Sequence, residues 1–212
     1  MVDTPPLRLH AVSVVVTAAF HNPSILNPDF LVSRAIVPED WNVAETLTTP
    51  PVAVVKYDNG IAWTVDESRL TVTEESGPEF GDTYLVHGLV DAYLEKLPHV
   101  PYRGLGLNWQ VTVPQADPGR WLIERFAADW LRADPQVRAL QPMFALDAGS
   151  AVCRITFTDA GGGEAACVAA ECNMHHQGPF GTRDLRSAVA RWPERQAFTL
   201  SALRKLLGSR PA

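Results

Sequence analysis

The spacing of hydrophobic and polar positions predicts that the chain opens with a strand. Residues 7–20 (LRLHAVSVVVTAAF) set valines in series with small polar residues, a pattern typical of β-structure. Residues 21–41 are punctuated by proline and asparagine, and we expect them to wrap the surface with one short helical turn at Phe30–Ser33.

Three further hydrophobic runs predict an antiparallel meander. They cover Val52–Tyr57, Ile61–Val65 and Leu70–Glu74. Asp58-Asn59-Gly60 joins the first two runs, and Asn-Gly favours the positive φ values of a type I′ hairpin turn.

The hydrophobic period changes to that of a helix over residues 82–97, where apolar side chains form one broad stripe. Asp82 or Thr83 is a suitable N-cap, and Pro98 ends the helix. Residues 100–114 return to strand, and we expect one of its faces to carry Tyr102, Gly104, Gly106, Asn108, Gln110 and Thr112.

The rest of the chain repeats this mixture of helices and strands. Asp117-Pro118 predicts the start of a helix that runs to about Arg132. The elements expected after it are a strand at residues 143–146, a hairpin of residues 151–158 and 164–174, and helical segments at residues 184–191 and 200–207.

This order of elements indicates an α+β protein. We expect one predominantly antiparallel sheet of about six to eight strands, with two or three helices packed on one face. The length of 212 residues suits a single domain, 1–212, and leaves room for a two-half organisation, 1–114 and 115–212.

Charge is distributed unevenly. The net charge is −6, which argues against broad nucleic-acid binding. The helical C-terminal segment 183–212 is basic: it carries seven basic and two acidic residues, hence +5, and leaves −11 on the preceding 182. We interpret it as a solvated amphipathic region against an acidic body, or as a docking surface for an acidic partner or nucleic acid through Arg186, Arg191, Arg204 and Lys205.

Neither a membrane segment nor a disulfide framework is expected. The longest apolar run, residues 11–20, is about half a transmembrane span, and no basic leader precedes it. Three clustered cysteines (Cys153, Cys167 and Cys172) cannot all pair internally. We therefore expect a cytoplasmic protein with no membrane partner.

Residues 171–176 (ECNMHH) hold the densest group of metal-binding and nucleophilic residue types. Glu171, Cys172, His175 and His176 are the candidates for catalysis, and Glu171 with the two histidines for a metal. Strand alternation puts Glu171 and His175 on one face and Cys172 and His176 on the other, with about 13 Å between residues four apart. Zinc needs its donors within about 2.3 Å, so only a turn at the histidines would bring them together. We expect no cofactor and place Cys172 in the core.

Other candidates are isolated. His99 follows a helix end, and Tyr102 and Asn108 form a polar pair beside the strand glycines of RGLGLNW. That Gly-x-Gly lacks the third glycine and the following helix of a dinucleotide loop. No serine has the Gly-x-Ser-x-Gly context of a hydrolase nucleophile.

The stretch YLEKLPHVPYRGLGLNW resembles an uncharacterised group of sporadically distributed bacterial proteins. The residues that carry the resemblance are Leu97, Pro98, His99, Tyr102, Gly106 and Asn108, together with NPSILNPDFL, IVPEDW and the terminal NMHH. The resemblance implies an N-terminal β segment, a hairpin, and a helix that leads into a Tyr-x-x-x-Gly-x-Asn strand. It also implies a bacterial, cytoplasmic protein, and it carries no activity.

Three functions follow as hypotheses. The first is a non-enzymatic module that binds a protein partner or itself, favoured by the lack of a catalytic constellation and by a long sheet that exposes an edge. The second is a small metal-dependent or Cys/His hydrolase built on the ECNMHH cluster, with His99 or Asn108 brought near by the fold. The third is nucleic-acid binding through the basic C-terminal helices.

Overall fold

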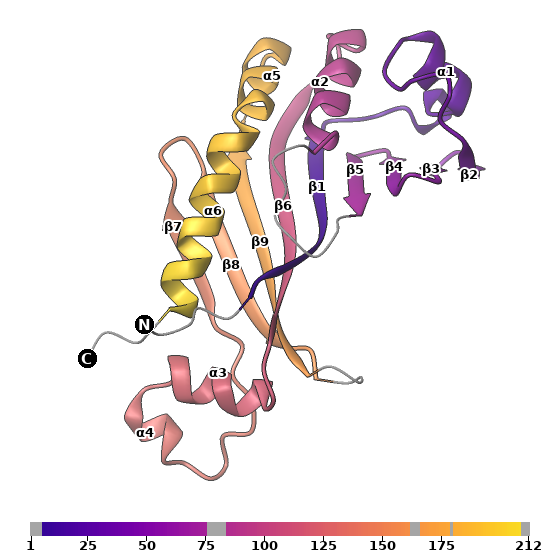
Figure 1. The fold of residues 1–212 in the computed structure, drawn as a ribbon. Coiled ribbons are helices and arrows are strands. Elements are labelled where there is room, and N and C mark those ends of the chain that lie inside the picture. The colour runs from indigo at the N-terminus through magenta and orange to yellow at the C-terminus, as the bar shows by residue number, and fades with distance from the viewer. Residues whose placement is uncertain (1–5, 76–83, 162–165, 179, 209–212) are drawn as a thin grey trace.

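In the computed structural model, residues 6–75, 84–161, 166–178 and 180–208 are described. They form one nine-stranded antiparallel sheet in the order β2-β3-β4-β5-β1-β6-β9-β8-β7 (Figure 1). The strands are β1 (Arg8–Ala18), β2 (Val43–Thr48), β3 (Val52–Tyr57), β4 (Ile61–Asp66), β5 (Arg69–Glu75), β6 (Tyr102–Pro114), β7 (Met143–Asp147), β8 (Val152–Asp159) and β9 (Cys167–Gln177). The helices are η1 (Pro23–Ile25), α1 (Pro28–Ser33), α2 (Val86–Lys96), α3 (Pro118–Phe126), α4 (Asp129–Arg132), α5 (Thr182–Ala190) and α6 (Trp192–Leu207). The α+β class is confirmed, although the described residues contain more strands and more helices than expected.

The chain follows the same path twice. From the central strand β1 it passes through η1 and α1 to the edge strand β2, returns by a meander to β5 beside β1, and enters α2. From the second central strand β6 it passes through α3 and α4 to the other edge, β7, returns through β8 to β9 beside β6, and enters α5 and α6. The antiparallel pair β1–β6 joins the two halves into one sheet. The second half therefore begins with β6, before the division at residue 114 suggested by the sequence.

Helices α2, α5 and α6 lie over one face of the sheet (Figure 1). Trp63 of β4 packs against Tyr93 of α2, with ring centroids 5.8 Å apart, and Trp109 of β6 packs 4.9 Å from Trp192 of α6. All four rings are buried in one continuous hydrophobic core. The opposite side carries the alternate residues of each strand, and we call it the helix-free face. Within the described residues no helix packs on it.

The hairpin between β3 and β4 shows how local sequence sets the fold. The Gly60 N–H donates to the Tyr57 carbonyl at 3.2 Å, and Gly60 has φ of +84°. The expected type I′ turn is wrong, because it requires positive φ at Asn59 as well, and among the described residues Ala35 alone combines a side chain with positive φ. Gly60 alone adopts the left-handed backbone conformation in this turn, and that is enough to close the hairpin.

Helix ends differ from the sequence prediction for identifiable reasons. The predicted N-caps Asp82 and Thr83 lie outside the described residues; instead, Glu74 of β5 accepts the Leu85 and Val86 N–H groups at 2.7 and 3.0 Å. This carboxylate satisfies two of the free N–H groups at the start of α2.

Two other helix boundaries were misread. The helix predicted to reach Arg132 is divided, because Ala127 and Ala128 have extended backbone between α3 and α4. The last helix, expected at residues 200–207, begins earlier, at Trp192: Pro193 lies in the first turn of α6, where proline is tolerated because its missing N–H has no acceptor there.

Candidate functional site

The ECNMHH segment is an uninterrupted part of β9. The strand runs to Gln177, past both histidines, and pairs with β6 along its whole length. The expectation that the strand ends at the histidines is therefore wrong, and no turn folds Glu171 or Cys172 back onto them. The predicted alternation is confirmed: Cys172 and His176 are buried on the helix-covered face, whereas Glu171 and His175 belong to the helix-free face.

Cys172 lies in the core between two sheet neighbours. Trp109 of β6 and Ile155 of β8 are its partners in the ladder, and its side chain is 2% exposed. Burial, with smaller contributions from Cys153 and Glu171, raises the pKa of this thiol well above its usual range. A thiol that stays protonated and shielded from solvent is a poor nucleophile.

His176 lies beside a buried arginine. Arg195 of α6 is 4% exposed and donates from Nη1 to the Ala148 carbonyl at 2.7 Å and from Nη2 to Ser150 Oγ at 2.9 Å. Burial, then the positive charge of Arg195 and smaller effects of His175 and Arg191, lowers the pKa of His176 to about 4. His176 is therefore neutral at physiological pH, and its Nε2 has no hydrogen-bond partner in the described part of the chain.

No metal centre is formed in the described residues. Within residues 6–75, 84–161, 166–178 and 180–208, no three His, Cys, Asp or Glu side chains are grouped closely enough to hold an ion. Glu171 and His175 share a face, but four residues of extended strand separate them by about 13 Å.

A row of polar side chains crosses the middle of the helix-free face. Asn173 of β9 donates from Nδ2 to Asn108 Oδ1 at 2.6 Å, and Asn108 of β6 donates from Nδ2 to Ser13 Oγ of β1 at 3.2 Å. A Cβ at Gly106 would lie 3.1 Å from Asn173 Nδ2, so this strand glycine leaves room for the row. The sequence pointed to Asn108 but not to Ser13 or Asn173, because cross-strand register cannot be read from one strand.

Tyr102 does not share this face, contrary to expectation. Thr17 pairs with Gly104 and Ala18 with Tyr102, so Arg103 is an extra residue at a β-bulge. The bulge turns Tyr102 into the core, where its hydroxyl donates to the Leu97 carbonyl at 2.9 Å. Tyr102 therefore ties the end of α2 to β6, while His99 is exposed in the connection between them.

The helix-free face ends in a polar pocket at the β7–β8 turn. The pocket has a volume of about 600 Å³, and its polar lining includes Asp147, Ser150, Arg154, His175 and Gln177. His175 is the one residue of the ECNMHH segment that lines it. Cys172 and His176, which belong to the same segment, lie on the helix-covered face of the sheet.

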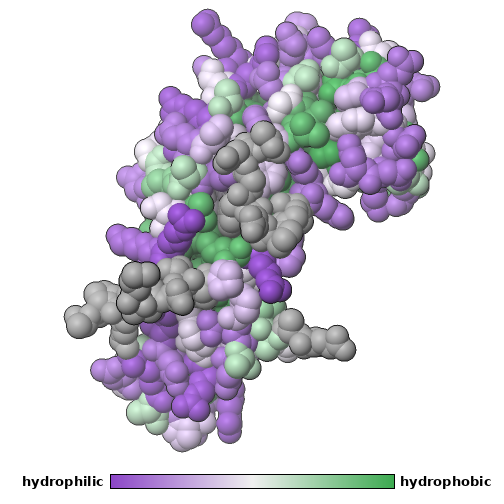
Figure 2. Space-filling model, in the orientation of Figure 1, coloured by the Kyte–Doolittle hydropathy of each residue, from purple (hydrophilic) through white to green (hydrophobic). Residues whose placement is uncertain are grey.

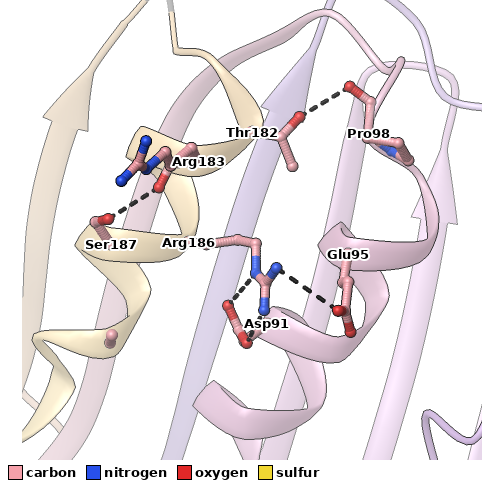
Figure 3. Close-up of a pocket in the computed structure, with 8 residues that line it drawn as sticks. Asp91, Glu95, Pro98, Thr182, Arg183, Arg186 and Ser187 are labelled. Carbon is pink, nitrogen blue, oxygen red and sulfur yellow. Dashed lines mark hydrogen bonds and ion pairs between the residues drawn. The ribbon is translucent and has the colours of Figure 1, made fainter.

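A second pocket, of about 460 Å³, lies between α2 and α5 (Figure 3). Arg186 points across it from α5 and forms two hydrogen bonds with the Asp91 carboxylate, Nε to Oδ1 at 2.7 Å and Nη2 to Oδ2 at 2.8 Å. Glu95 lies 3.9 Å from Arg186 Nη1. The guanidinium therefore joins two helices and is already neutralised by this chain.

The other basic candidates do not extend Arg186 into a continuous surface. Arg191 is exposed between α5 and α6, and Arg204 and Lys205 are exposed in the last turn of α6. With a rise of 1.5 Å per residue, about 20 Å of helix separates Arg191 from that turn.

The strand with the most exposed residues in the sheet is β2, which sequence reasoning missed. All six of its residues are exposed, and its described pairing is to β3 on one side. Val43 and Leu47 are 41% and 46% exposed. The signal in the sequence is short, namely three β-branched residues (Val43, Thr46 and Thr48) within VAETLT before Pro50-Pro51.

The comparisons with known proteins add no assignment. No protein-family model matches the chain, and no curated protein is similar to it. Across the described residues, the helices are too short or too polar to cross a membrane. From the side seen in Figure 1, the surface is mostly hydrophilic, with hydrophobic areas of limited extent (Figure 2).

Proposed function

We propose that this protein is a non-enzymatic binding module that takes an extended segment of a protein partner onto the edge of β2. The observation that carries this proposal is the free edge itself: six exposed residues whose described hydrogen bonding is to β3 alone. An exposed edge offers unpaired N–H and C=O groups, to which an added strand can bond. The resemblance to bacterial proteins makes the bacterial cytoplasm its proposed location.

Protection against such pairing is confined to one end of the edge, where a β-bulge lies between Val43 and Glu45. Natural sheets guard their edges with lysine, proline or inward-pointing charge. The one charged side chain of β2 is Glu45, and Lys56 of β3 binds it at 2.7 Å. The distribution of the candidate catalytic residues also favours binding over hydrolysis, because Cys172 and His176 are buried on one face and Glu171 and His175 lie on the other.

The register identifies the residue to change. Thr49 and Val52 exchange both of their backbone hydrogen bonds, at 2.9 and 3.3 Å. Pairs alternate along an antiparallel ladder, so Leu47–Val54 is the next bonded pair, and the backbone groups of Thr46 and Thr48 point outward. Thr46→Pro therefore removes an outward N–H and leaves the bonds to β3 intact.

Selection from a displayed library of extended peptides tests the proposal. We expect the selection to enrich peptides that bind the wild-type protein. The same peptides should bind the control Thr46→Val, which keeps the N–H. Their affinity for Thr46→Pro should be at least tenfold lower, on the order of one lost hydrogen bond or more. Circular dichroism and urea unfolding verify that both variants are folded. Failure to enrich any peptide, or equal binding by Thr46→Pro, would contradict the proposal.

A further inference from the structure

The shape and chemistry of the β2 edge also define one occupant for it. We propose that β2 pairs antiparallel with β2 of a second copy of this chain, with Leu47 on the two-fold axis, so that two sheets join into one. This inference rests on the proposed function, since it names the strand that the edge accepts.

The backbone limits the registers that are available. In an antiparallel pair, outward-facing groups must meet outward-facing groups, which here belong to Thr46 and Thr48. When Thr46 pairs with Thr48 of the second copy, the outward N–H and C=O groups of both residues form hydrogen bonds. The two-fold axis repeats this pair, so it occurs once on each side of the axis. Pairing of Thr46 with its own equivalent sets Glu45 against Leu47, and pairing of Thr48 with its own equivalent brings Pro50, which has no N–H, to an outward position.

Side chains favour the same register. Leu47 then faces Leu47 of the second copy as a non-hydrogen-bonded pair, in which side chains approach most closely. Val54, the β3 neighbour of Leu47, is half-buried on the helix-free face and widens this apolar contact. Exposed Leu47 would lose much of its contact with water.

Charge does not oppose the contact, although the chain as a whole carries −6. Glu45 faces Thr49 of the second copy, away from Glu45 of that copy, and Lys56 of its own chain already binds it at 2.7 Å. The area that one short strand buries is below that of a standard stable interface, so the association is concentration-dependent.

Cysteine crosslinking tests the register. A non-hydrogen-bonded pair has Cα atoms about 4.5 Å apart, within the range that a disulfide spans. We expect Leu47→Cys to form a covalent dimer under mild oxidation severalfold faster than the matched variant Thr46→Cys, which faces Thr48. The wild-type chain controls for half-buried Cys167.

Light scattering over a concentration series supplies the second measurement. The average mass of the wild-type protein should rise toward that of a dimer, whereas Leu47→Lys and Thr46→Pro should stay monomeric. A wild-type protein that is monomeric at every concentration, or equal crosslinking of Leu47→Cys and Thr46→Cys, would overturn the inference. If such a monomer still binds extended peptides that Thr46→Pro rejects, the proposed function stands without the second copy; if it binds none, both fail.

Discussion

His176 and Arg195 bring two basic side chains together beneath α6. Arg195 is bonded to a carbonyl and a hydroxyl, and neither residue forms an ion pair with a described carboxylate. Burial, and after it the positive charge of Arg195, lowers the pKa of His176, so the protein keeps this side chain neutral. The pair therefore links the stability of the fold to pH.

Stability should fall as the pH is lowered from about 6.5 to about 4. The folded-state pKa of His176 is about 4, whereas in the unfolded chain its pKa is the ordinary 6.5, so the unfolded state binds the proton first. The contribution of His176 to this loss is at most about 3 kcal/mol. Urea unfolding at a series of pH values should show a shallower dependence for His176→Leu, even if that variant is less stable at pH 7.5. Burial also lowers the pKa of His21 and His87, so some dependence remains. If the unfolding free energy of His176→Leu fell with pH as steeply as that of the wild type, His176 would not be the source of this pH dependence.

At the scale of the element, the polar row of Ser13, Asn108 and Asn173 links three neighbouring strands, β1, β6 and β9. Asn108 is its middle member, with one bond to each neighbouring strand. Because all three side chains are half-buried, their bonds are only partly replaced by water when one is lost.

Alanine substitutions in the row should show which of its members contributes most to stability. We expect Asn108→Ala, which breaks two bonds, to lower the free energy of unfolding by about 1–3 kcal/mol, and Asn173→Ala, which breaks one, by about 0.5–1.5 kcal/mol. Chemical denaturation measures both. A larger loss for Asn173→Ala would show that Asn108 is not the centre of the row.

Elements differed in how well the sequence predicted them. The β3–β5 meander and β6 followed from local periodicity, and the helical turn at α1 was expected within a stretch punctuated by proline and asparagine; all were confirmed. By contrast, β2 exists because β3 supplies its partner, and the Arg103 bulge is fixed by the pairing of β6 with β1. At the candidate site, alternation separated Cys172 from His175, but the length of β9 depended on how far β6 continues beside it. Local pattern therefore predicted the faces of β9, whereas non-local pairing decided strand ends, sheet edges and the face of Tyr102.

At the scale of the whole molecule, the β1–β6 pair makes the two halves one structure. The sheet is hydrogen-bonded across this pair, and a single hydrophobic core extends beneath it from Trp63 to Phe157. We therefore expect one cooperative unfolding transition.

Fluorotryptophan NMR during urea titration checks this expectation at separate positions. The resonances of Trp63, in the first half, and of Trp192, in the second, should disappear at the same urea concentration. Assignment would use single Trp→Phe variants. Two midpoints would show that each half unfolds by itself.

The central place of β1 also has a consequence for synthesis. Its neighbours in the sheet, β5 and β6, begin about 50 and 85 residues after β1 ends, so at translation rates of about 5–20 residues per second β1 emerges several seconds before either can pair with it. During that interval an apolar, β-prone segment, AVSVVVTAAF, has both edges open. The strand that finally joins the two halves is thus open to aggregation on the ribosome, and we expect a nascent chain halted before residue 69 to depend on chaperones to stay soluble.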